Sequence, residues 1–524
     1  MKPLSYRAML ALAAAVFGVS MVTFVLLRPL LPVDETRYLS VAWDMWQGSS
    51  KIVPRLNGEL YSHKPPLLFW LMNLVWSVFG LGDIAPRLVA PTFGLASVLL
   101  TGGLARRLWP DAPDRAGLAA LIVATSVVFL LFGSTTMFDT MLTAATLAAM
   151  LALVALRSAP GTLPVLGLGA ALALGVFAKG PVILVHVMPA ALLMPLWADR
   201  QTRPALASWY RAIALSVVVA LALVALWLGP ALVFGGEEYR SDVLWRQSAG
   251  RMVDSFAHNR PVWFFVAMLP VFAWPWGWSR SALAALAPRA LIAEEASRLL
   301  LVWAVGALVA FSLISGKQVH YLVPEMPALA LLLSGMVVGA ATIWRKAVLL
   351  APAILIGALA VAIFVGAFPP AEVNGATFSL VNLMAPIAVV AALCAIVLLP
   401  VPRRVGIAAA APATLLALHL TLYPMIWSGY DPTPIASVLA QDQDMGVATT
   451  DPGYAGQFSF AGRLQKPLPK LLTPEALADW MAAHPGGTVL SRNEALAQPG
   501  LTLVLERNFH GKDYRIYQVA GSVP

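Results

Sequence analysis

Charged residues and cysteine are scarce in this sequence of 524 residues. Only 12% of its residues are charged and 59% are hydrophobic, whereas a typical soluble domain has about 25% charged residues. This composition excludes a chain of soluble domains, and it excludes a disordered chain, which needs low hydrophobicity. The single cysteine, Cys394, excludes a disulfide framework and a cysteine zinc site. The sequence also lacks a glycine-rich phosphate-binding loop, so nothing in it indicates a soluble nucleotide.

Long apolar runs are abundant instead, and the mean hydropathy of the chain is +0.78. A helix needs about 20 mostly apolar residues to cross a bilayer, so these runs predict a polytopic all-α membrane domain. The first run is longer than the core of a signal peptide, which predicts an uncleaved anchor. A shorter run at 65–80, led by Pro65-Pro66, predicts a juxtamembrane or re-entrant helix. The thirteen predicted spans are 8–31, 86–108, 116–133, 137–156, 163–178, 181–197, 212–234, 262–279, 299–315, 319–341, 347–368, 378–400 and 405–425.

Basic residues are concentrated in alternate short loops between these spans. These loops hold Lys2, Arg7, Arg106, Arg107, Arg115, Arg157, Arg200, Arg203, Arg211, Arg280, Arg289, Arg298, Arg345, Lys346, Arg403 and Arg404. By the positive-inside rule they are cytoplasmic. We therefore expect a multi-pass membrane protein with a cytoplasmic N-terminus and a tail on the opposite side of the membrane. The net charge of +9 then reflects membrane topology, and nucleic acid is not an expected partner.

The tail differs from the rest of the chain in composition and pattern. We expect a transmembrane domain over 1–430, with long periplasmic segments at 32–85 and 235–261, and a separate domain over 431–524. Alternating apolar residues predict short strands in this tail, and Thr473 is placed to cap a helix that ends near Ala483. The predicted fold is therefore a membrane domain of about thirteen helices with a small C-terminal α/β periplasmic domain.

Two adjacent carboxylates, Asp34 and Glu35, directly follow the first span. Acidic residues at a helix start often satisfy free backbone amides, so one interpretation is a helix cap. The other is a functional carboxylate at the membrane surface. Lys64 lies before Pro65-Pro66, and a residue before proline is restricted to extended geometry. Such a backbone can aim Lys64 into a cleft, whereas the alternative is a lysine that reaches to the membrane interface.

Two further polar residues lie at the outer ends of spans. Asp139 begins a span, where an acid is costly unless it is solvated or used. Lys179 precedes Gly180-Pro181 in a predicted outer turn, where a cation runs against the positive-inside bias. The alternative for Asp139 is placement at a helix N-terminus, while for Lys179 we favour a functional role.

The remaining polar candidates lie in two outer segments. Lys317 and Tyr321 are one helical turn apart, so both are expected to face one cavity. The segment 235–261 contains arginines, aromatic residues and His258, which suit a phosphate, a sugar or lipid headgroups.

Taken together, five separate segments bring Asp, Lys, Arg, His and Tyr to one face of the membrane. Cations suit a phosphate, and a carboxylate suits a general base. This combination predicts transfer of a group from a lipid phosphate at the bilayer surface. The alternative from another class is a secondary transporter or lipid flippase. It predicts midplane charges and broken helices in two related halves, of which the sequence shows little.

A series of motifs follows in order along the chain. These motifs are Asp34-Glu35-Thr36-Arg37-Tyr38, Pro54-Arg55-Leu56-Asn57-Gly58, Tyr61-Ser62-His63-Lys64-Pro65-Pro66-Leu67, Ala85-Pro86-Arg87-Leu88, Lys179-Gly180-Pro181, Pro261-Val262-Trp263-Phe264-Phe265 and the segment from Lys317 to Pro324. They resemble the motifs of the bacterial branch of the C-type glycosyltransferases, and the nearest members look like lipid A aminoarabinose transferases and related protein mannosyltransferase-like enzymes. The resemblance covers nearly the whole chain, and it implies a protein of the bacterial inner membrane.

This resemblance implies a polyprenyl-phosphate sugar as donor and inversion at the anomeric carbon on the periplasmic face. The implied acceptor is lipid A, another glycan or a protein, and membrane lipids surround the enzyme. Asp34 is implied as the catalytic carboxylate. The residues implied in binding the donor phosphate or substrate are Lys64, Arg37, Glu35, Lys179, Lys317, Tyr321, Asp139, Tyr61, Arg87 and His258.

Two positions depart from the pattern of the aminoarabinose transferases. His63 stands where those enzymes usually have Glu before Lys-Pro-Pro, and Gln247-Ser248 stand ahead of Arg251 where they often have Glu-His. The sugar, the acceptor and a bound divalent metal are therefore left open. A protein O-mannosyltransferase-like enzyme is the alternative within the same class.

Overall fold

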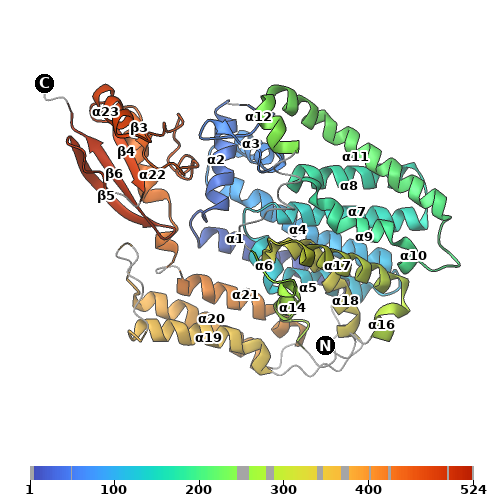
Figure 1. The fold of residues 1–524 in the computed structure, drawn as a ribbon. Helices are drawn as coiled ribbons and strands as arrows, with labels where there is room; N and C mark the ends of the chain where they lie inside the picture. The colour runs from blue at the N-terminus through green and yellow to red at the C-terminus, as the bar shows by residue number, and fades with distance from the viewer. Residues whose placement is uncertain are drawn as a thin grey trace.

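The computed structural model describes residues 5–48, 50–244, 259–278, 288–338, 346–367, 374, 377–399, 403–422, 426–492 and 495–521. Helices form one large body, and a smaller unit of strands and helices from the end of the chain stands at one side of it (Figure 1).

The helical body is built from long apolar helices and shorter connecting ones. Its first half contains α1 (Tyr6–Leu26), α2 (Asp34–Trp46), α3 (Leu67–Phe79), α4 (Ile84–Leu108), α5 (Pro113–Ala124), α6 (Val127–Gly133), α7 (Asp139–Ser158), α8 (Thr162–Lys179), α9 (Ile183–Leu192), α10 (Met194–Trp197) and α11 (Leu206–Phe234). Its second half contains α12 (Gly236–Ser241), α14 (Phe264–Ala273), α16 (Pro288–Ala293), α17 (Glu295–Leu313), α18 (Met326–Val338), α19 (Lys346–Phe364), α20 (Leu380–Leu398) and α21 (Arg403–Leu422). Short 3-10 helices are η1 (Gly180–Val182), η3 (Val319–Glu325) and η4 (Trp427–Gly429).

The thirteen predicted spans can be compared with the long apolar helices among the described residues. Within the described residues, nine helices are long and apolar enough to cross a membrane, or ten if α5 and α6, bent by 61°, form one span. In the described parts of two predicted spans, 262–279 and 319–341, the apolar helices are shorter than a span. Prolines explain the shortening, because Pro275 follows α14 and Pro324 lies in η3, and proline cannot donate the helical hydrogen bond. The chain is a multi-pass membrane protein, and the count of thirteen stays a prediction.

The stretch Thr162–Leu192 is long enough for one span, but it reverses direction at Gly180. This glycine has φ +79°, which the right-handed helix does not allow. A Cβ atom at Gly175 would lie only 2.4 Å from Cγ1 of Ile183. Eight residues of straight helix would separate the two positions by about 12 Å. Gly180 therefore ends α8 and starts the return through η1 and α9, as the predicted turn at Lys179-Gly180-Pro181 requires.

The segment between α1 and α4 forms a compact layer at one end of the helical body. It consists of α2, a two-stranded hairpin of β1 (Arg55–Leu56) and β2 (Glu59–Leu60), and α3. Aromatic residues hold this layer together, and Trp76 packs against Trp43 and Trp46 with ring centroids 6.3 and 5.9 Å apart. The predicted juxtamembrane run 65–80 is α3, which buries one face against α2 and α4.

The C-terminal unit confirms the predicted small α/β fold. Its sheet has the order β3-β4-β6-β5, with β3 and β4 parallel and the other neighbours antiparallel. Thr473 caps the last helix by accepting a hydrogen bond from the Ala476 amide, and Pro474 occupies the first helical position. The elements are α22 (Thr433–Gln441), β3 (Val447–Thr449), α23 (Pro474–Ala483), β4 (Thr488–Arg492), β5 (Leu501–Phe509) and β6 (Lys512–Val519).

The C-terminal unit docks on the layer of α2 and the β1–β2 hairpin (Figure 1). Nε1 of Trp43 donates to the Leu464 carbonyl at 2.8 Å. The side chain of Asn57 pairs with the backbone of Leu468 in both directions, at 2.8 and 3.1 Å. These hydrogen bonds satisfy polar groups that would otherwise bond to water. They therefore give the C-terminal unit a defined position on the layer of α2 and the β1–β2 hairpin.

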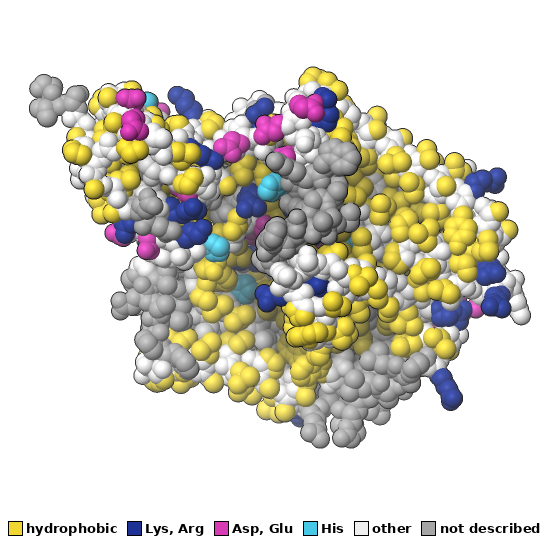
Figure 2. Space-filling model, in the orientation of Figure 1, with side chains coloured by type: hydrophobic (Ala, Val, Ile, Leu, Met, Phe, Trp, Pro, Cys, Tyr) yellow, Lys and Arg dark blue, Asp and Glu magenta, His cyan; other side chains and the backbone are white. Residues whose placement is uncertain are grey.

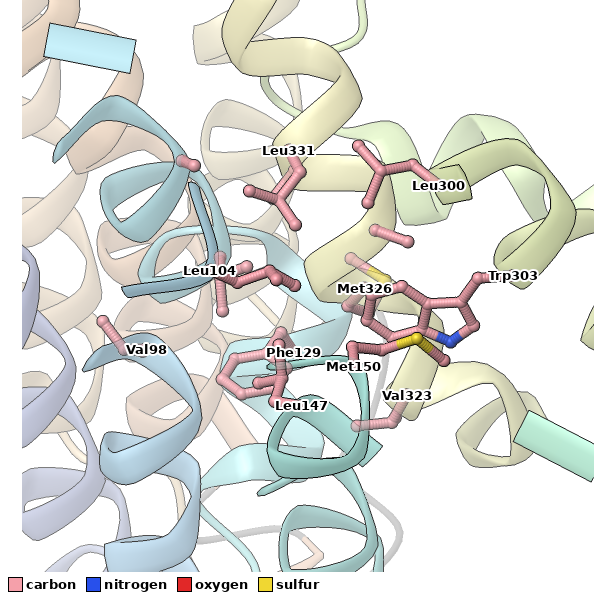
Figure 3. Packing of buried hydrophobic residues seen from close by; sticks show 14 of the residues in the cluster. Val98, Leu104, Phe129, Leu147, Met150, Leu300, Trp303, Val323, Met326 and Leu331 are labelled. Carbon is pink, nitrogen blue, oxygen red and sulfur yellow. The ribbon is translucent and has the colours of Figure 1, made fainter. Parts of the chain in front are cut away.

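A large apolar core joins the helices beneath this layer. Figure 3 shows its centre, where Phe129 of α6 and Met150 of α7 meet Trp303 of α17 and Met326 of α18. All four side chains are almost completely buried. Close packing of this kind resists movement of one helix against another. It therefore fixes the outer ends of α7, α17 and η3, which carry the polar residues described next.

Candidate active site

An acid and a lysine form an ion pair at the outer ends of α7 and α8. Nζ of Lys179 lies 2.6 Å from Oδ1 of Asp139, whose side chain is 2% exposed. Asp139 is the first residue of α7, where the helix dipole favours a negative charge. Lys179 is the last residue of α8, because Gly180 stops the helix there. Two residues 40 positions apart thus share one buried charge pair.

Aromatic residues and further cations surround this pair. Nζ of Lys179 lies 5.4 Å from the centroid of the Tyr321 ring, and Nζ of Lys64 lies 5.6 Å from that of Phe138. Such contacts stabilise a cation through its electrostatic attraction to the face of an aromatic ring. Asp139 interacts electrostatically with Lys64 as well as with Lys179. Lys64, which precedes Pro65 in the loop, therefore lies close to the ion pair of Asp139 and Lys179.

Asp34 lies at the edge of this cluster as the first residue of α2. The N-cap position of α2 is Val33, and no side chain caps the helix. Asp34 is therefore not a helix cap. Its Oδ1 accepts a hydrogen bond of 2.9 Å from the hydroxyl of Tyr38, one turn further along. Burial raises the pKa of Tyr38 well above its usual value, and the charge of Asp34 and the neighbouring Tyr61 raise it further. Tyr38 thus stays a donor that orients a half-buried carboxylate.

His320 belongs to the cluster, although the sequence alone did not single it out. It interacts electrostatically with Asp34, Asp139, Lys64 and Lys179, and its ring packs on Tyr321 at 5.0 Å. Tyr38 was likewise missed. Two features of the sequence could have identified these residues. His320 lies between Lys317 and Tyr321, and Tyr38 lies one helical turn after Asp34.

Glu35 and Arg87 lie beneath this cluster in a buried network. Oε1 of Glu35 lies 2.9 Å from Nη2 of Arg28, and its Oε2 lies 3.6 Å from Nη2 of Arg87. The carboxylate also accepts backbone hydrogen bonds from Leu31 at 3.0 Å and Thr136 at 2.9 Å. Burial alone would raise the pKa of Glu35, but the two guanidinium groups and these amides lower it from 4.5 to about 2. The network ties α2 to α4 and to the start of α7.

This network predicts a loss of stability in acid. The folded-state pKa of Glu35 is depressed to about 2 from 4.5, so its contribution is present above pH 4.5 and is lost as the pH falls toward 2. We expect the thermal unfolding midpoint of the purified protein in detergent to decrease from about pH 5 to about pH 3. A midpoint that does not change over this interval would contradict the assignment of a charged, paired Glu35.

The other predicted residues occupy different environments. Lys317 is buried, and its Nζ donates to the backbone carbonyls of Ile314 and, at 2.9 Å, of Arg260. Tyr61 is buried, and its ring stacks on His63 at 5.3 Å. Arg37 is partly exposed and forms no ion pair with a described residue. His258 lies outside the described residues.

The described residues offer no group of three or more His, Cys, Asp or Glu side chains that would hold a metal ion. The acids of the cluster are already matched with protein groups, as Asp139 is with Lys179 and Asp34 with Tyr38.

The molecular surface agrees with this location. Figure 2 shows a hollow between the C-terminal unit and the helical body, with Lys, Arg, His and acidic side chains around it. A broad hydrophobic surface covers the helical body, and basic side chains return at its far edge. Buried acids and cations at one end of an apolar helical body, beneath a small α/β unit, define a membrane protein that can bind an anionic headgroup at its surface.

Comparison with solved structures identifies this architecture. The fold is similar to that of ArnT from Cupriavidus metallidurans bound to undecaprenyl phosphate, with a TM-score of 0.76 over 98% of this chain and 99% of that one, at 18% identity. The apo state of the same protein gives a TM-score of 0.73. The chain therefore has the C-type glycosyltransferase fold.

Sequence comparisons point in the same direction. Residues 63–228 match the family model described as dolichyl-phosphate-mannose-protein mannosyltransferase. The chain is 32% identical over 334 residues to the undecaprenyl phosphate-alpha-4-amino-4-deoxy-L-arabinose arabinosyl transferase of Pectobacterium carotovorum, covering 60% of this chain and 56% of that relative. The transferase of the same name from Pseudomonas aeruginosa PAO1 is 30% identical over 57% of this chain and 54% of its own length. The matches thus span little more than half of the length of these relatives. They confirm the predicted resemblance to lipid A aminoarabinose transferases and mannosyltransferase-like enzymes.

Proposed function

We propose that this protein is an inverting membrane glycosyltransferase that moves a sugar from a polyprenyl phosphate to lipid A or a similar glycolipid. The observation that carries the proposal is the cluster of Asp34, Lys64, Asp139 and Lys179 at one end of the helical body. The names of the relatives support an undecaprenyl phosphate donor. His63, which stands in place of the usual Glu, leaves the identity of the sugar open.

In this proposal the cations act on the leaving phosphate. An acceptor oxygen attacks the anomeric carbon from the face opposite the phosphate, and the bond between this carbon and the phosphate oxygen breaks. The electron pair of that bond leaves with the phosphate, whose negative charge increases. Lys64 and Lys179 balance that charge in a partly dry site, where preorganised charges act most strongly. Asp139 keeps Lys179 in place, since their contact is 2.6 Å.

Asp34 is the proposed catalytic carboxylate. It takes the proton of an attacking hydroxyl group as a general base, while the Tyr38 hydroxyl holds the carboxylate in position. Tyr321 lines the donor pocket through its contact with Lys179. Lys317, Glu35 and Arg87 act indirectly, because their contacts with backbone and with each other shape the loops that carry the cluster.

The proposed location is the bacterial inner membrane, with the cluster and the C-terminal domain on the periplasmic side. The basic loops support this orientation. Three of their arginines pair with acids at the opposite end of the helical body, namely Arg115 with Glu294, Arg157 with Glu295, and Arg298 with Asp199. A donor on the periplasmic side has to be lipid-linked, because nucleotide sugars are generally confined to the cytoplasm.

A protein O-mannosyltransferase is the second candidate, favoured by the family model that matches residues 63–228. The two activities share a lipid-phosphate donor and differ in sugar and acceptor. Mass spectrometry of lipid A, surface glycans and glycoproteins, from cells with and without the protein, separates them. A sugar-sized mass that is lost from lipid A supports the first activity, and one lost from a protein supports the second. No change in any of these molecules would contradict both and favour a transporter.

Replacing Lys64 with alanine is expected to weaken donor binding by about 10- to 100-fold, because a charge-assisted hydrogen bond contributes roughly 1.5–3 kcal/mol. The measurement is the dissociation constant for undecaprenyl phosphate in detergent. Lys470→Ala is the control, since Lys470 of the C-terminal unit pairs at 2.8 Å with Glu59 of the β1–β2 hairpin, whose side chain is 67% exposed. Equal affinity of wild type and Lys64→Ala would remove Lys64 from the phosphate site.

A further inference from the structure

A second acid–base pair lies inside the helical body, apart from the cluster described above. Nδ1 of His186 on α9 lies 2.6 Å from Oε1 of Glu325, the last residue of η3. Their side chains are 1% and 8% exposed. A buried pair of this kind adds little net stability, because the cost of removing it from water offsets the attraction. The role of the pair therefore depends on the two segments that it connects, α9 and η3.

The pair connects the two segments that lead to the proposed active site. α9 follows Lys179 after the turn at η1, and η3 carries His320 and Tyr321. A helix starting just after Lys179 and a loop starting at Lys317 thus meet at this contact. Because both segments come from distant parts of the sequence, a separate interaction has to fix their relative position.

Aromatic rings extend the contact from the pair to the site. The ring of Phe311 on α17 lies 5.2 Å from that of His186 and 5.7 Å from that of Tyr321. The Tyr321 ring in turn lies 5.4 Å from Nζ of Lys179. A series of side-chain contacts, through His186, Phe311 and Tyr321, therefore joins Glu325 to the Lys179 ammonium.

The segment η3 needs such support from outside. A 3-10 helix has poor hydrogen-bond geometry and seldom exceeds three or four residues, whereas η3 has seven. Pro324, within it, donates no backbone hydrogen bond. Nε2 of His186 and Oε2 of Glu325 are buried without a hydrogen-bond partner among the described residues. Buried polar atoms without a hydrogen-bond partner lower stability, so they are retained where the contact holds two segments in a required position.

We infer that His186 and Glu325 are positioning residues, which fix η3 against α9 and thereby hold Tyr321 over Lys179 for the lipid phosphate. The inference rests on the proposed function, because it is the donor phosphate that Lys179 and Tyr321 would bind. It concerns binding geometry, so it is tested without turnover.

The test is the dissociation constant of the purified full-length protein for undecaprenyl phosphate in detergent. Glu325→Ala is expected to weaken binding about tenfold, whereas Glu325→Gln, whose amide can still form the hydrogen bond with Nδ1 of His186, stays within about threefold of wild type. Glu295→Gln is the matched control, because Glu295 also lies in a pair, with Arg157, at the far end of α17. The double variant His186→Leu with Glu325→Leu removes both buried polar groups, so it should fold and still bind weakly.

A double-mutant cycle with Tyr321→Ala distinguishes positioning from general stability. If the pair acts through Tyr321, Glu325→Ala adds no more than about twofold once Tyr321 is absent. Wild-type affinity in Glu325→Ala and in the double leucine variant, or fully additive losses in the cycle, would overturn the inference while the proposed function stands. A wild-type protein that binds no undecaprenyl phosphate would overturn the proposed function, and the inference with it.

Discussion

Asp34→Asn is expected to lower the rate of sugar transfer by about 10²–10⁴-fold, the usual contribution of a positioned general base. The substitution removes the charge but keeps the shape, and the amide oxygen of the new side chain still accepts the hydrogen bond that Tyr38 donates to Asp34 at 2.9 Å. Asp34 is only partly buried and begins its helix, so the fold should survive. The measurement is sugar transfer by the purified variant in detergent, with the donor at saturating concentration.

The control for this prediction is Asp431→Asn. Asp431 accepts a hydrogen bond from the Thr433 amide in the C-terminal unit, far from the cluster in the chain. Its variant should transfer sugar at the wild-type rate. Donor affinity provides a second check, because a lost base lowers turnover and leaves the binding of undecaprenyl phosphate unchanged. If Asp34→Asn transfers sugar as fast as the wild type, Asp34 is not the catalytic carboxylate.

Glu35→Ala is expected to destabilise the protein by about 3–5 kcal/mol, the usual cost of removing one partner of a buried ion pair. Its carboxylate faces Arg28 at 2.9 Å and Arg87 at 3.6 Å, all within the protein. The substitution leaves two buried guanidinium groups without their acid, and the Leu31 and Thr136 amides lose an acceptor. Thermal unfolding in detergent, followed by loss of the monodisperse protein, measures the effect.

Glu295→Ala is the matched comparison for Glu35→Ala. Glu295 also pairs with an arginine, at 3.0 Å, but its side chain is 26% exposed. Partly solvated pairs contribute only about 0–1 kcal/mol, so this variant should unfold close to the wild type. If both variants lower the unfolding temperature equally, burial does not distinguish the two acids, and Glu35 is not the centre of a structural network.

The acids Asp34 and Glu35 show why adjacent residues in one motif can have different roles. Asp34 and Glu35 are neighbours in the sequence, yet a helix directs successive side chains about 100° apart. Asp34 therefore contacts the Tyr38 hydroxyl, while Glu35 points into the helical body toward Arg28 and Arg87. The resemblance assigned substrate binding to both Glu35 and Arg87. We propose instead that they hold the loops on which the binding residues lie.

His320 and Lys317 also show how far local sequence predicts the role of a residue. Lys317 has the residue type expected in a phosphate pocket, but its ammonium group is engaged by backbone carbonyls. His320, three residues later, interacts electrostatically with four residues of the cluster. Local sequence shows which residue types a segment carries. It does not show which of them the segment turns toward a site.

The sequence by itself determined that this is a multi-pass membrane protein with a small α/β unit after the last span, because apolar run length and strand alternation are local properties. It also predicted that the unusual polar residues lie at the ends of spans on one side of the membrane. Only the tertiary structure decided which of them meet. The contacts of Asp139 with Lys179, of Glu35 with Thr136 and of His186 with Glu325 join residues 40, 101 and 139 positions apart. Such contacts depend on how helices pack against each other, which the local pattern does not specify.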